Sequence, residues 1–372
     1  MKMLIRIVVL ICLSLPLSAI GAGEKVKIGV IYGDSPWSGT DTQLELIGPR
    51  FAIEDLNRIG GLLGRQIELV ELDNHNSALG SKQAAQKAVE AGVIAVIGPV
   101  ASSHSVVAGA VLQKAQIPMI SPFAINSEVT LMGDYIFRIN FSDRTQGQAL
   151  AHFAFHDLKA KTAVVLTCPE EKFSLGLSEI FKTFFKENGG AILWEGEYMS
   201  SATDFEQLLK KASSFHPNVI FLSGYERASG FIIRQSRNMG ENVTFLGGNS
   251  WTDNLYKYGG DAIEGCFHSG PWFPDRKNVT SREFIDRYKD SFRNEQILLL
   301  ALSHDAVFLL ADAVRRADSL DPASIRTALA TTTGFQGITG TISMDRNGDP
   351  AKPISIFKYE NGGSVFVKTV TP

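Results

Sequence analysis

Short runs of consecutive apolar residues alternate with longer stretches in which apolar residues recur every three or four positions. The first run, residues 26–32, predicts a strand, and the stretch after it predicts a helix that ends at the glycine pair Gly60-Gly61. This helix carries its apolar residues on one stripe, at Leu44, Ile47, Phe51 and Leu56. The pattern then predicts strands at 65–72, 93–97 and 117–120 and helices at 82–91 and 105–115.

A second series of the same kind begins after a break at residues 140–145. It predicts strands at 163–167, 191–198, 219–223 and 243–246, a short strand near Gly265, and helices at 175–188, 204–213 and 228–239. Continuous apolar strands separated by amphipathic helices are what a parallel sheet covered on both faces requires. The two successive series therefore predict an α/β protein with two lobes of similar architecture.

The C-terminal third predicts helices at 281–292, 298–317 and 322–330 and strands at 337–343, 354–359 and 364–369. The pairs Asn347-Gly348 and Asn361-Gly362 suit hairpin turns. This section is too short for a third domain, so we expect its helices to complete the first lobe and its hairpins the second. The chain would then cross between the lobes three times, near residues 142, 270 and 340. The N-terminal lobe would hold residues 24–141 plus 271–340, and the C-terminal lobe residues 142–270 plus 341–372.

The first 22 residues have the order of a secretory signal peptide. Lys2 and Arg6 precede an apolar run at 7–17, and small residues follow from Ala19 to Gly23, where we expect cleavage. A membrane anchor is the alternative, but the run is shorter than the ~20 residues that a spanning helix needs. No later apolar run is expected to approach that length. The sequence therefore predicts export from the cytoplasm.

Composition excludes several classes of protein. Hydrophobic residues make up 44% of the chain and charged residues 20%, which is typical of a globular protein. The formal net charge is −3 and basic residues form no block, so we expect no nucleic-acid partner. Cys168 and Cys266 would remain after cleavage, and an exported protein could hold them as thiols or as a disulfide.

The sequence lacks the common signatures of catalysis. It has no G-x-G-x-x-G turn after a strand, P-loop, H-E-x-x-H run, C-x-x-C pair or G-x-S-x-G elbow, and its seven histidines lack metal-ligand spacing. We therefore expect no enzyme, no metal and no cofactor. An exported hydrolase built on Ser102 is an alternative, but His104, two residues further along a helix, would point to another face. A repressor of similar fold class would need an N-terminal helix-turn-helix, which the chain does not show.

The loop after the strand at 93–97 carries the most informative polar residues. Gly98-Pro99 is followed by Ser102 and Ser103 at the predicted start of a helix. Hydroxyls and unpaired amides at a helix N-terminus suit a carboxylate, because the helix dipole also favours negative charge there. Alternatively, Ser102 or Ser103 only caps the helix. The next strand ends at residues 121–126 (SPFAIN), whose backbone, including Ala124, would face the same crevice.

Three segments resemble the leucine/isoleucine/valine-binding group of periplasmic solute-binding proteins, which supply ABC importers. They are residues 55–64 (DLNRIGGLLG), 98–105 (GPVASSHS) and 119–122 (MISP). The order and spacing of the elements resemble the family over residues 24–367. The resemblance implies a type I periplasmic-binding fold, in which two Rossmann-like lobes with mainly parallel sheets are joined by a three-crossing hinge. It also implies a periplasmic location and a ligand that is captured when the lobes close.

The resemblance also implies the residues of the ligand site. Ser102 would contact a ligand carboxylate, with Ser103 beside it, and Phe123 and Ile125 would add contacts from the first lobe. Phe173 and Tyr225 would cover the ligand from the second lobe, although core packing is the alternative for both aromatic residues.

Two departures from the family concern the ligand. The family often has threonine where this chain has Ile125, and amino-acid binders have a carboxylate where this chain has Asn249. A buried ligand ammonium would lose its charge partner there. Three acids could substitute for the missing carboxylate, namely Asp41, Glu226 and Asp253. Two tryptophans in cleft-facing loops, Trp37 and Trp251, add flat apolar surface. The pocket would therefore suit a neutral or aromatic carboxylate rather than an α-amino acid.

The function predicted from these features is the extracytoplasmic solute-binding protein of an ABC importer. Its ligand would be a small carboxylate, either a branched-chain or other amino acid or an aromatic or keto acid. Its partners would be permease subunits in the inner membrane, and we expect a monomer. The alternative is a sensor of the same fold that reports its ligand to a signalling partner.

Overall fold

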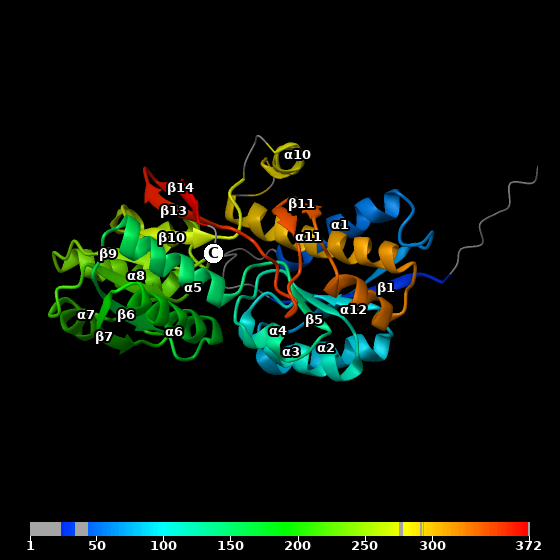
Figure 1. Cartoon of the computed structure of the whole chain (residues 1–372), viewed down its shortest axis with the longest axis horizontal. Coiled ribbons are helices and arrows are strands. Elements are labelled where there is room, and N and C mark those ends of the chain that lie inside the picture. The colour runs from blue at the N-terminus through cyan, green and yellow to red at the C-terminus, as the bar shows by residue number, and fades with distance from the viewer. Residues whose placement is uncertain (1–23, 34–43, 275–277, 291, 293, 371–372) are drawn as a thin grey trace, which may run out of the picture.

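The computed structural model describes residues 24–33, 44–274, 278–290, 292 and 294–370. Two α/β lobes lie side by side, each built on its own large sheet (Figure 1). We call the lobe with the five-stranded sheet the N-lobe and the lobe with the seven-stranded sheet the C-lobe. The predicted signal peptide, Trp37 and Asp41 lie outside the described residues.

The N-lobe begins with a series of alternating strands and helices. Their bounds are β1 Val26–Tyr32, α1 Leu44–Arg58, β2 Ile67–Asp73, α2 Ala78–Ala91, β3 Ala95–Ile97, α3 Ser102–Ala115, β4 Met119–Ser121, α4 Glu128–Leu131 and β5 Ile136–Arg138. The sheet has the order β2-β1-β3-β4-β5, and every neighbouring pair is parallel. Two apolar cores, one on each face of this sheet, include residues from α1 and from α2.

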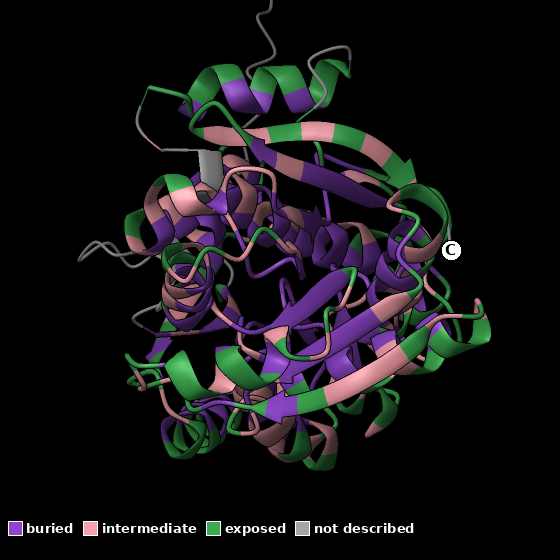
Figure 2. Cartoon of the chain, turned by 90° about the vertical axis from the view of Figure 1, so that its left-hand side faces the viewer, coloured by how far each residue is buried: buried purple, intermediate pink, exposed green. Residues whose placement is uncertain are grey.

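The C-lobe repeats this arrangement. Its elements are α5 Asp143–His152, which continues into a π-helical turn at Phe153–Asp157, then β6 Thr162–Thr167, α6 Lys172–Glu187, β7 Ala191–Glu197, α7 Glu206–Ser213, β8 Val219–Ser223, α8 Glu226–Asn238, β9 Thr244–Gly247, α9 Tyr256–Gly259 and β10 Phe267–Gly270. The sheet order is β14-β13-β10-β9-β8-β6-β7, where β13 Ile354–Glu360 and β14 Gly363–Val370 are antiparallel additions. Strand β8 is buried at every residue, whereas burial alternates along the edge strand β14 (Figure 2). The predicted α/β fold with mainly parallel sheets is confirmed.

The C-terminal third returns to the N-lobe before it completes the C-lobe. Helices α10 Val279–Tyr288, α11 Asn294–Ala317 and α12 Pro322–Ala330 lie on the N-lobe side, where α11 packs against α1 (Figure 1). The chain therefore passes between the two sheets after β5, after β10 and again before β13.

The C-terminal hairpins differ in part from the prediction. Asn361-Gly362 forms the turn between β13 and β14, with φ of 56° and 83°, as a type I′ turn requires. Residues 337–343 do not form one strand. They belong to a separate hairpin of β11 Phe335–Gly337 and β12 Gly340–Ile342, which lies in neither large sheet. Asn347-Gly348 lies in the third crossing, in a turn where Gly348 N donates to Asp345 O at 3.1 Å and an isolated antiparallel bridge joins Met344 and Pro350, so the turn forms but connects no strands of a large sheet.

Helix α5 begins within the predicted break at residues 140–145 and continues through a stretch for which no element is predicted. Its segment is polar and contains Gly147, which is a poor helix former in isolation. A Cβ atom at Gly147 would lie 2.6 Å from Ile180 Cγ2 on α6. Glycine is therefore needed for the close packing of α5 against α6, and this tertiary contact outweighs its low helix propensity.

Helix α11 contradicts the expectation that no later apolar run approaches the length of a membrane-spanning helix. Among the described residues, Gln296–Ala317 is the one helix long and apolar enough to cross a membrane, with a mean hydropathy of 1.9 over its most apolar window. That window is 78% buried inside the protein. Helices α1 and α12 and the sheet cover this helix, so apolar residues are favourable on most of its sides. It is therefore a core helix of the N-lobe.

A buried guanidinium joins the first and third crossings. Arg138, at the end of β5, has a fully buried side chain and forms an ion pair with Asp349. Its other donors reach Ala124 O at 3.2 Å, Asn126 O at 3.0 Å and Thr130 Oγ1 at 2.6 Å. A buried charge is tolerated only when it is paired and hydrogen-bonded, so Asp349 is a structural partner of the 124–126 loop.

We expect Asp349→Ala to lower the free energy of unfolding by about 3–5 kcal/mol, because it leaves the guanidinium of Arg138 buried without its counter-charge. Urea unfolding of the purified variant measures this loss. Asp261→Ala removes an exposed acid and should change stability by less than about 0.5 kcal/mol. Equal stability of the two variants would contradict the structural role of the ion pair.

His268 is a buried imidazole within the C-lobe. Its ring stacks on Phe357 and Tyr359, with centroid distances of 5.1 and 4.8 Å, and Nε2 lies 3.0 Å from Ser364 Oγ. Burial lowers the pKa of His268 from 6.5 to about 4. The folded protein therefore holds this imidazole neutral in a pH range where the unfolded chain protonates it.

Stability should fall as the pH falls from 6.5 towards 4, because the unfolded state binds the proton first. For His268 alone the loss between pH 7 and pH 5 is about 2 kcal/mol. Urea unfolding at the two pH values measures it. In His268→Gln the difference between pH 7 and pH 5 should shrink by that amount, and an unchanged difference would rule out His268 as its source.

Candidate ligand-binding site

A narrow pocket lies between the two lobes, with only about 10 Å³ of free space in this structure, and we call it the cleft pocket. It is lined by Val100, Ala101, Ser102, Phe123, Ala124 and Ile125 of the N-lobe and by Phe173, Tyr225 and Asn249 of the C-lobe. All of these residues follow the carboxyl ends of parallel strands, namely β3, β4, β6, β8 and β9. The structure thus brings together seven of the residues singled out from the sequence, and Ser103 is not among the lining residues.

The N-terminus of α3 faces this pocket. The helix begins at Ser102, and its N-cap residue is Ala101, which has no side-chain oxygen to cap it. Ser102 and Ser103 are therefore not N-caps, which removes that interpretation. Ser102 Oγ accepts a hydrogen bond from Asn126 N at 3.3 Å, so its own proton remains available to donate.

Two buried hydroxyls hold the loop before α3. Pro99 O accepts hydrogen bonds from Ser105 Oγ at 2.9 Å and Ser121 Oγ at 2.7 Å. The two hydroxyls are 3.3 Å apart, so they link the start of α3 to the end of β4. The sequence analysis missed both serines because their function is indirect: they fix the position of Ser102 and do not line the pocket.

Two stacked rings form the C-lobe wall. The rings of Phe173 and Tyr225 have centroids 5.5 Å apart and an interplanar angle of 23°. Phe173 is only 5% exposed and also belongs to the core of the C-lobe. Its ring therefore has both of the roles considered from the sequence, because it packs in the core and also lines the cleft pocket. Burial raises the pKa of Tyr225 well above its ordinary value, and the nearby carboxylates of Glu171 and Glu45 add to this effect. The phenol therefore keeps its proton at neutral pH.

Asn249 is held by an amide network. Gln146 Nε2 donates to Asn249 Oδ1 at 3.1 Å and to Ser269 Oγ at 2.7 Å. Gly248 permits this arrangement, because a Cβ atom there would lie 2.7 Å from Leu177 Cδ2 and 3.1 Å from Phe173 Cζ. Gln146, on the unpredicted helix α5, is a second supporting residue that the sequence analysis missed.

The cleft pocket contains no acidic residue among the described residues that line it. Glu226 accepts hydrogen bonds from Thr252 N at 3.1 Å and Asn254 Nδ2 at 3.0 Å, so it braces the segment after β9. Asp253 accepts one from Ser364 N at 2.9 Å and lines a different cavity. Neither acid lines the cleft pocket.

That second cavity, which we call the aromatic cavity, adjoins the cleft pocket at Asn249. It encloses about 230 Å³ and is lined by Asn249, Trp251, Thr252, Asp253, His268, Ser269, Gly270, Trp272, Phe273, Pro274, Leu298, Phe357 and Ser364. Trp251, expected in a cleft-facing loop, is 1% exposed and lines this cavity instead of the cleft pocket.

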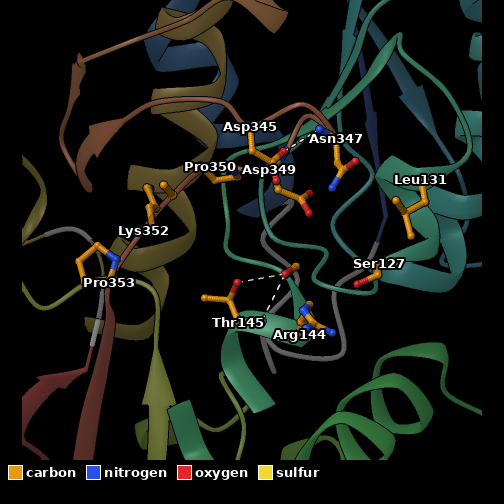
Figure 3. A pocket seen from close by; sticks show the side chains of 12 residues that line it. Ser127, Leu131, Arg144, Thr145, Asp345, Asn347, Asp349, Pro350, Lys352 and Pro353 are labelled. Carbon is orange, nitrogen blue, oxygen red and sulfur yellow. Dashed lines mark hydrogen bonds between the residues drawn. The ribbon is translucent and has the colours of Figure 1, made fainter. Parts of the chain in front are cut away.

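A third cavity lies at the crossings between the lobes. It encloses about 480 Å³, and its walls come from Ser127 and Leu131, from the start of α5, and from the third crossing. Figure 3 shows Arg144 and Thr145 on one side and Asp345, Asn347 and Asp349 on the other. Because it adjoins the Arg138–Asp349 ion pair, this cavity belongs to the region that connects the lobes.

The described residues offer no other chemistry at the cleft. No group of three or more His, Cys, Asp or Glu side chains within them could hold a metal ion. Cys168 and Cys266 are buried free thiols, so they do not form the disulfide that the sequence left open. Ser102 Oγ bonds to a backbone amide, and burial lowers the pKa of His104 on the same helix.

Comparisons with known proteins agree with this architecture. A periplasmic binding protein family model matches residues 25–364. A Leu/Ile/Val-binding protein homolog of Brucella melitensis is 31% identical over 322 residues, which is 85% of each chain. The crystal structure of the leucine binding protein LivK from Thermotoga maritima covers 93% of this chain and 99% of its own, with 33% identity and a TM-score of 0.87.

A structure with a bound ligand is also similar. It is LivJ from Streptococcus pneumoniae, a branched-chain amino acid transporter substrate binding protein in complex with isoleucine. It covers 94% of this chain and 100% of its own, with 26% identity and a TM-score of 0.85. These relatives are binding proteins and not enzymes. With its two parallel-sheet lobes, its type I fold and a family match over nearly the whole described chain, the chain belongs to the periplasmic binding protein family.

Proposed function

We propose that this protein is exported and serves as the solute-binding protein of an ABC importer, where it captures a small carboxylate in the cleft pocket. The observation that carries the proposal is the cleft pocket itself, in which the uncapped start of α3 and Ser102 face the C-lobe residues Phe173, Tyr225 and Asn249. The names of the similar proteins from Brucella melitensis and Thermotoga maritima support a binding protein, and that of LivJ from Streptococcus pneumoniae, a transporter substrate binding protein, supports a link to transport.

The carboxylate would bind at the N-terminus of α3. The first amides of a helix have no partner within the helix, and the helix dipole favours an anion there. Ser102 would donate its hydroxyl proton to the carboxylate. Because Ser105 and Ser121 fix this loop before the ligand arrives, little ordering would be needed on binding.

Lobe closure would follow from the division of the pocket. A ligand that touches both lobes binds the closed form more tightly than the open form, and it shifts the equilibrium by that difference in affinity. We propose lobe boundaries at residues 24–141 plus 271–340 and 142–270 plus 341–372. We further propose a monomer with a signal peptide at residues 1–22, whose closed form is recognised by permease subunits.

The described lining of the cleft pocket favours a neutral or aromatic carboxylate over an α-amino acid. Ile125 offers no hydroxyl, and the neutral amide of Asn249 stands where amino-acid binders have a carboxylate. A buried ammonium next to Asn249 would lack a counter-charge, which is costly in a desolvated site. A branched-chain amino acid remains the competing ligand, because LivJ binds isoleucine.

Ser102→Ala should weaken binding of the carboxylate by about 10- to 100-fold, because it removes a hydrogen bond to a charged group. The ligand would first be identified by a thermal-shift screen of amino acids, aromatic acids and short amides, and affinity would be measured by calorimetry. Ser103→Ala should bind like the wild type, since Ser103 does not line the cleft pocket. Unchanged affinity in Ser102→Ala would contradict the proposed site.

Asn249→Asp should reverse the preference between ligand classes. The new carboxylate would still accept the hydrogen bond from Gln146 Nε2, but it would add the negative charge that a ligand ammonium needs. We expect leucine to gain affinity and aromatic or keto acids to lose it, by about tenfold or more in each direction. Equal or tighter binding of leucine by the wild-type protein would overturn the proposed ligand class.

A further inference from the structure

The aromatic cavity has the size and the walls of a ligand subsite. It is lined by the rings of Trp251, Trp272, Phe273, Phe357 and His268 and by a few polar groups. A cavity of roughly 150 Å³ is enough to hold a benzene ring. At about 230 Å³ the aromatic cavity would hold such a ring with room for a substituent. Aromatic walls favour a planar ring, because offset and edge-on contacts add to the burial of apolar area.

The cavity also contains polar groups suited to a hydroxyl. Trp251 Nε1 is buried and finds no hydrogen-bond acceptor among the described residues. A buried donor without a partner costs free energy, so a ligand acceptor that reached Nε1 after a small shift of the indole ring would be favourable. Asp253 lines the same cavity and could accept a hydrogen bond from the same ligand group. A hydroxyl would serve both residues, because it accepts one hydrogen bond and donates another.

The two pockets share one lining residue. Asn249 lines both the cleft pocket and the aromatic cavity. Gln146 donates to Asn249 and to Ser269, which lines the aromatic cavity, so the same amide fixes the boundary between the pockets. Gln146 Oε1 is itself buried without a partner among the described residues. The boundary between the two pockets is therefore polar and neutral at Asn249, and no charged side chain lines the cleft pocket among the described residues.

We infer that the ligand extends through both pockets, with its carboxylate at Ser102 and a hydroxyl-bearing aromatic ring in the aromatic cavity. The ring would lie among Trp272, Phe273 and Phe357. Its hydroxyl oxygen would accept a hydrogen bond from Trp251 Nε1, and its O–H would donate a hydrogen bond to Asp253, keeping its proton. This inference rests on the proposed function and adds to it the length of the ligand and the chemistry of its far end.

The test is calorimetry on mature protein that has been unfolded and refolded to remove any bound ligand. The probes are benzoate, phenylpropanoate, para-hydroxyphenylpropanoate and aminohexanoate. The hydroxylated long acid should bind tightest and benzoate at least about tenfold more weakly, because benzoate is too short to reach the aromatic cavity. Aminohexanoate tests the opposite idea, that Asp253 and the rings bind a cationic end.

Two variants separate the contributions of the cavity. Trp251→Phe keeps an aromatic ring but removes the donor, so it should weaken the hydroxylated acid about 2- to 10-fold and leave phenylpropanoate unchanged. Phe273→Ala removes a ring that is 40% exposed, and it should weaken both long acids but not benzoate. Trp194→Phe is the matched control, because Trp194 stacks on Phe215 away from both pockets.

The outcomes distinguish this inference from the proposed function. Suppose that Ser102→Ala weakens the binding of every acid, but affinity does not depend on the length of the acid and neither Trp251→Phe nor Phe273→Ala changes it. The extended ligand would then be wrong, while the carboxylate site at Ser102 would stand. Tightest binding of aminohexanoate, lost in Asp253→Asn, would also overturn the aromatic end group. If no acid depends on Ser102, the proposed function itself fails.

Discussion

The buried guanidinium of Arg138 is the interaction on which the cleft depends. It holds the carbonyls of Ala124 and Asn126, the hydroxyl of Thr130 and the carboxylate of Asp349 in one cluster. These groups belong to the loop after β4, to α4 and to the third crossing between the lobes. Because a buried charge without its partners is strongly unfavourable, the loop that lines the pocket cannot shift independently of the crossing. The lobe closure that we propose would therefore occur around this cluster.

The two sides of the cleft contribute in different ways. On the N-lobe side, Ser105 and Ser121 fix the loop before α3, so the anion-binding end is prepared by the fold. On the C-lobe side, stacked rings and an amide network line the rest of the cleft pocket. The lobes also meet outside the pocket, where Asn126 Nδ2 donates to Lys172 O at 2.9 Å. Charge at the pocket is sparse, so shape and hydrogen bonding would decide specificity more than ion pairing.

The alternation of apolar runs and amphipathic stripes predicted most strands of the two sheets, because strands of a parallel sheet are buried on both faces and must be apolar throughout. It missed the short strand β5 and the short helix α4. The two-lobe organisation followed from the doubled series. Helix α5 could not be predicted, since Gly147 is favourable only when α6 lies against it. The Asn347-Gly348 pair likewise has the sequence of a hairpin turn, but its flanking residues connect the lobes and have no partner strand to pair with in a large sheet.

For the candidate site, the sequence by itself determined which loops meet, because the carboxyl ends of parallel strands lie on one edge of each sheet. It also determined that Asn249 is neutral. Only the tertiary structure decided where individual side chains point: Ser103 lies outside the pocket lining, Glu226 braces Thr252 and Asn254, and Trp251 lines the neighbouring cavity. The physical reason is that side-chain direction depends on helix phase and on packing against distant segments, neither of which local sequence specifies.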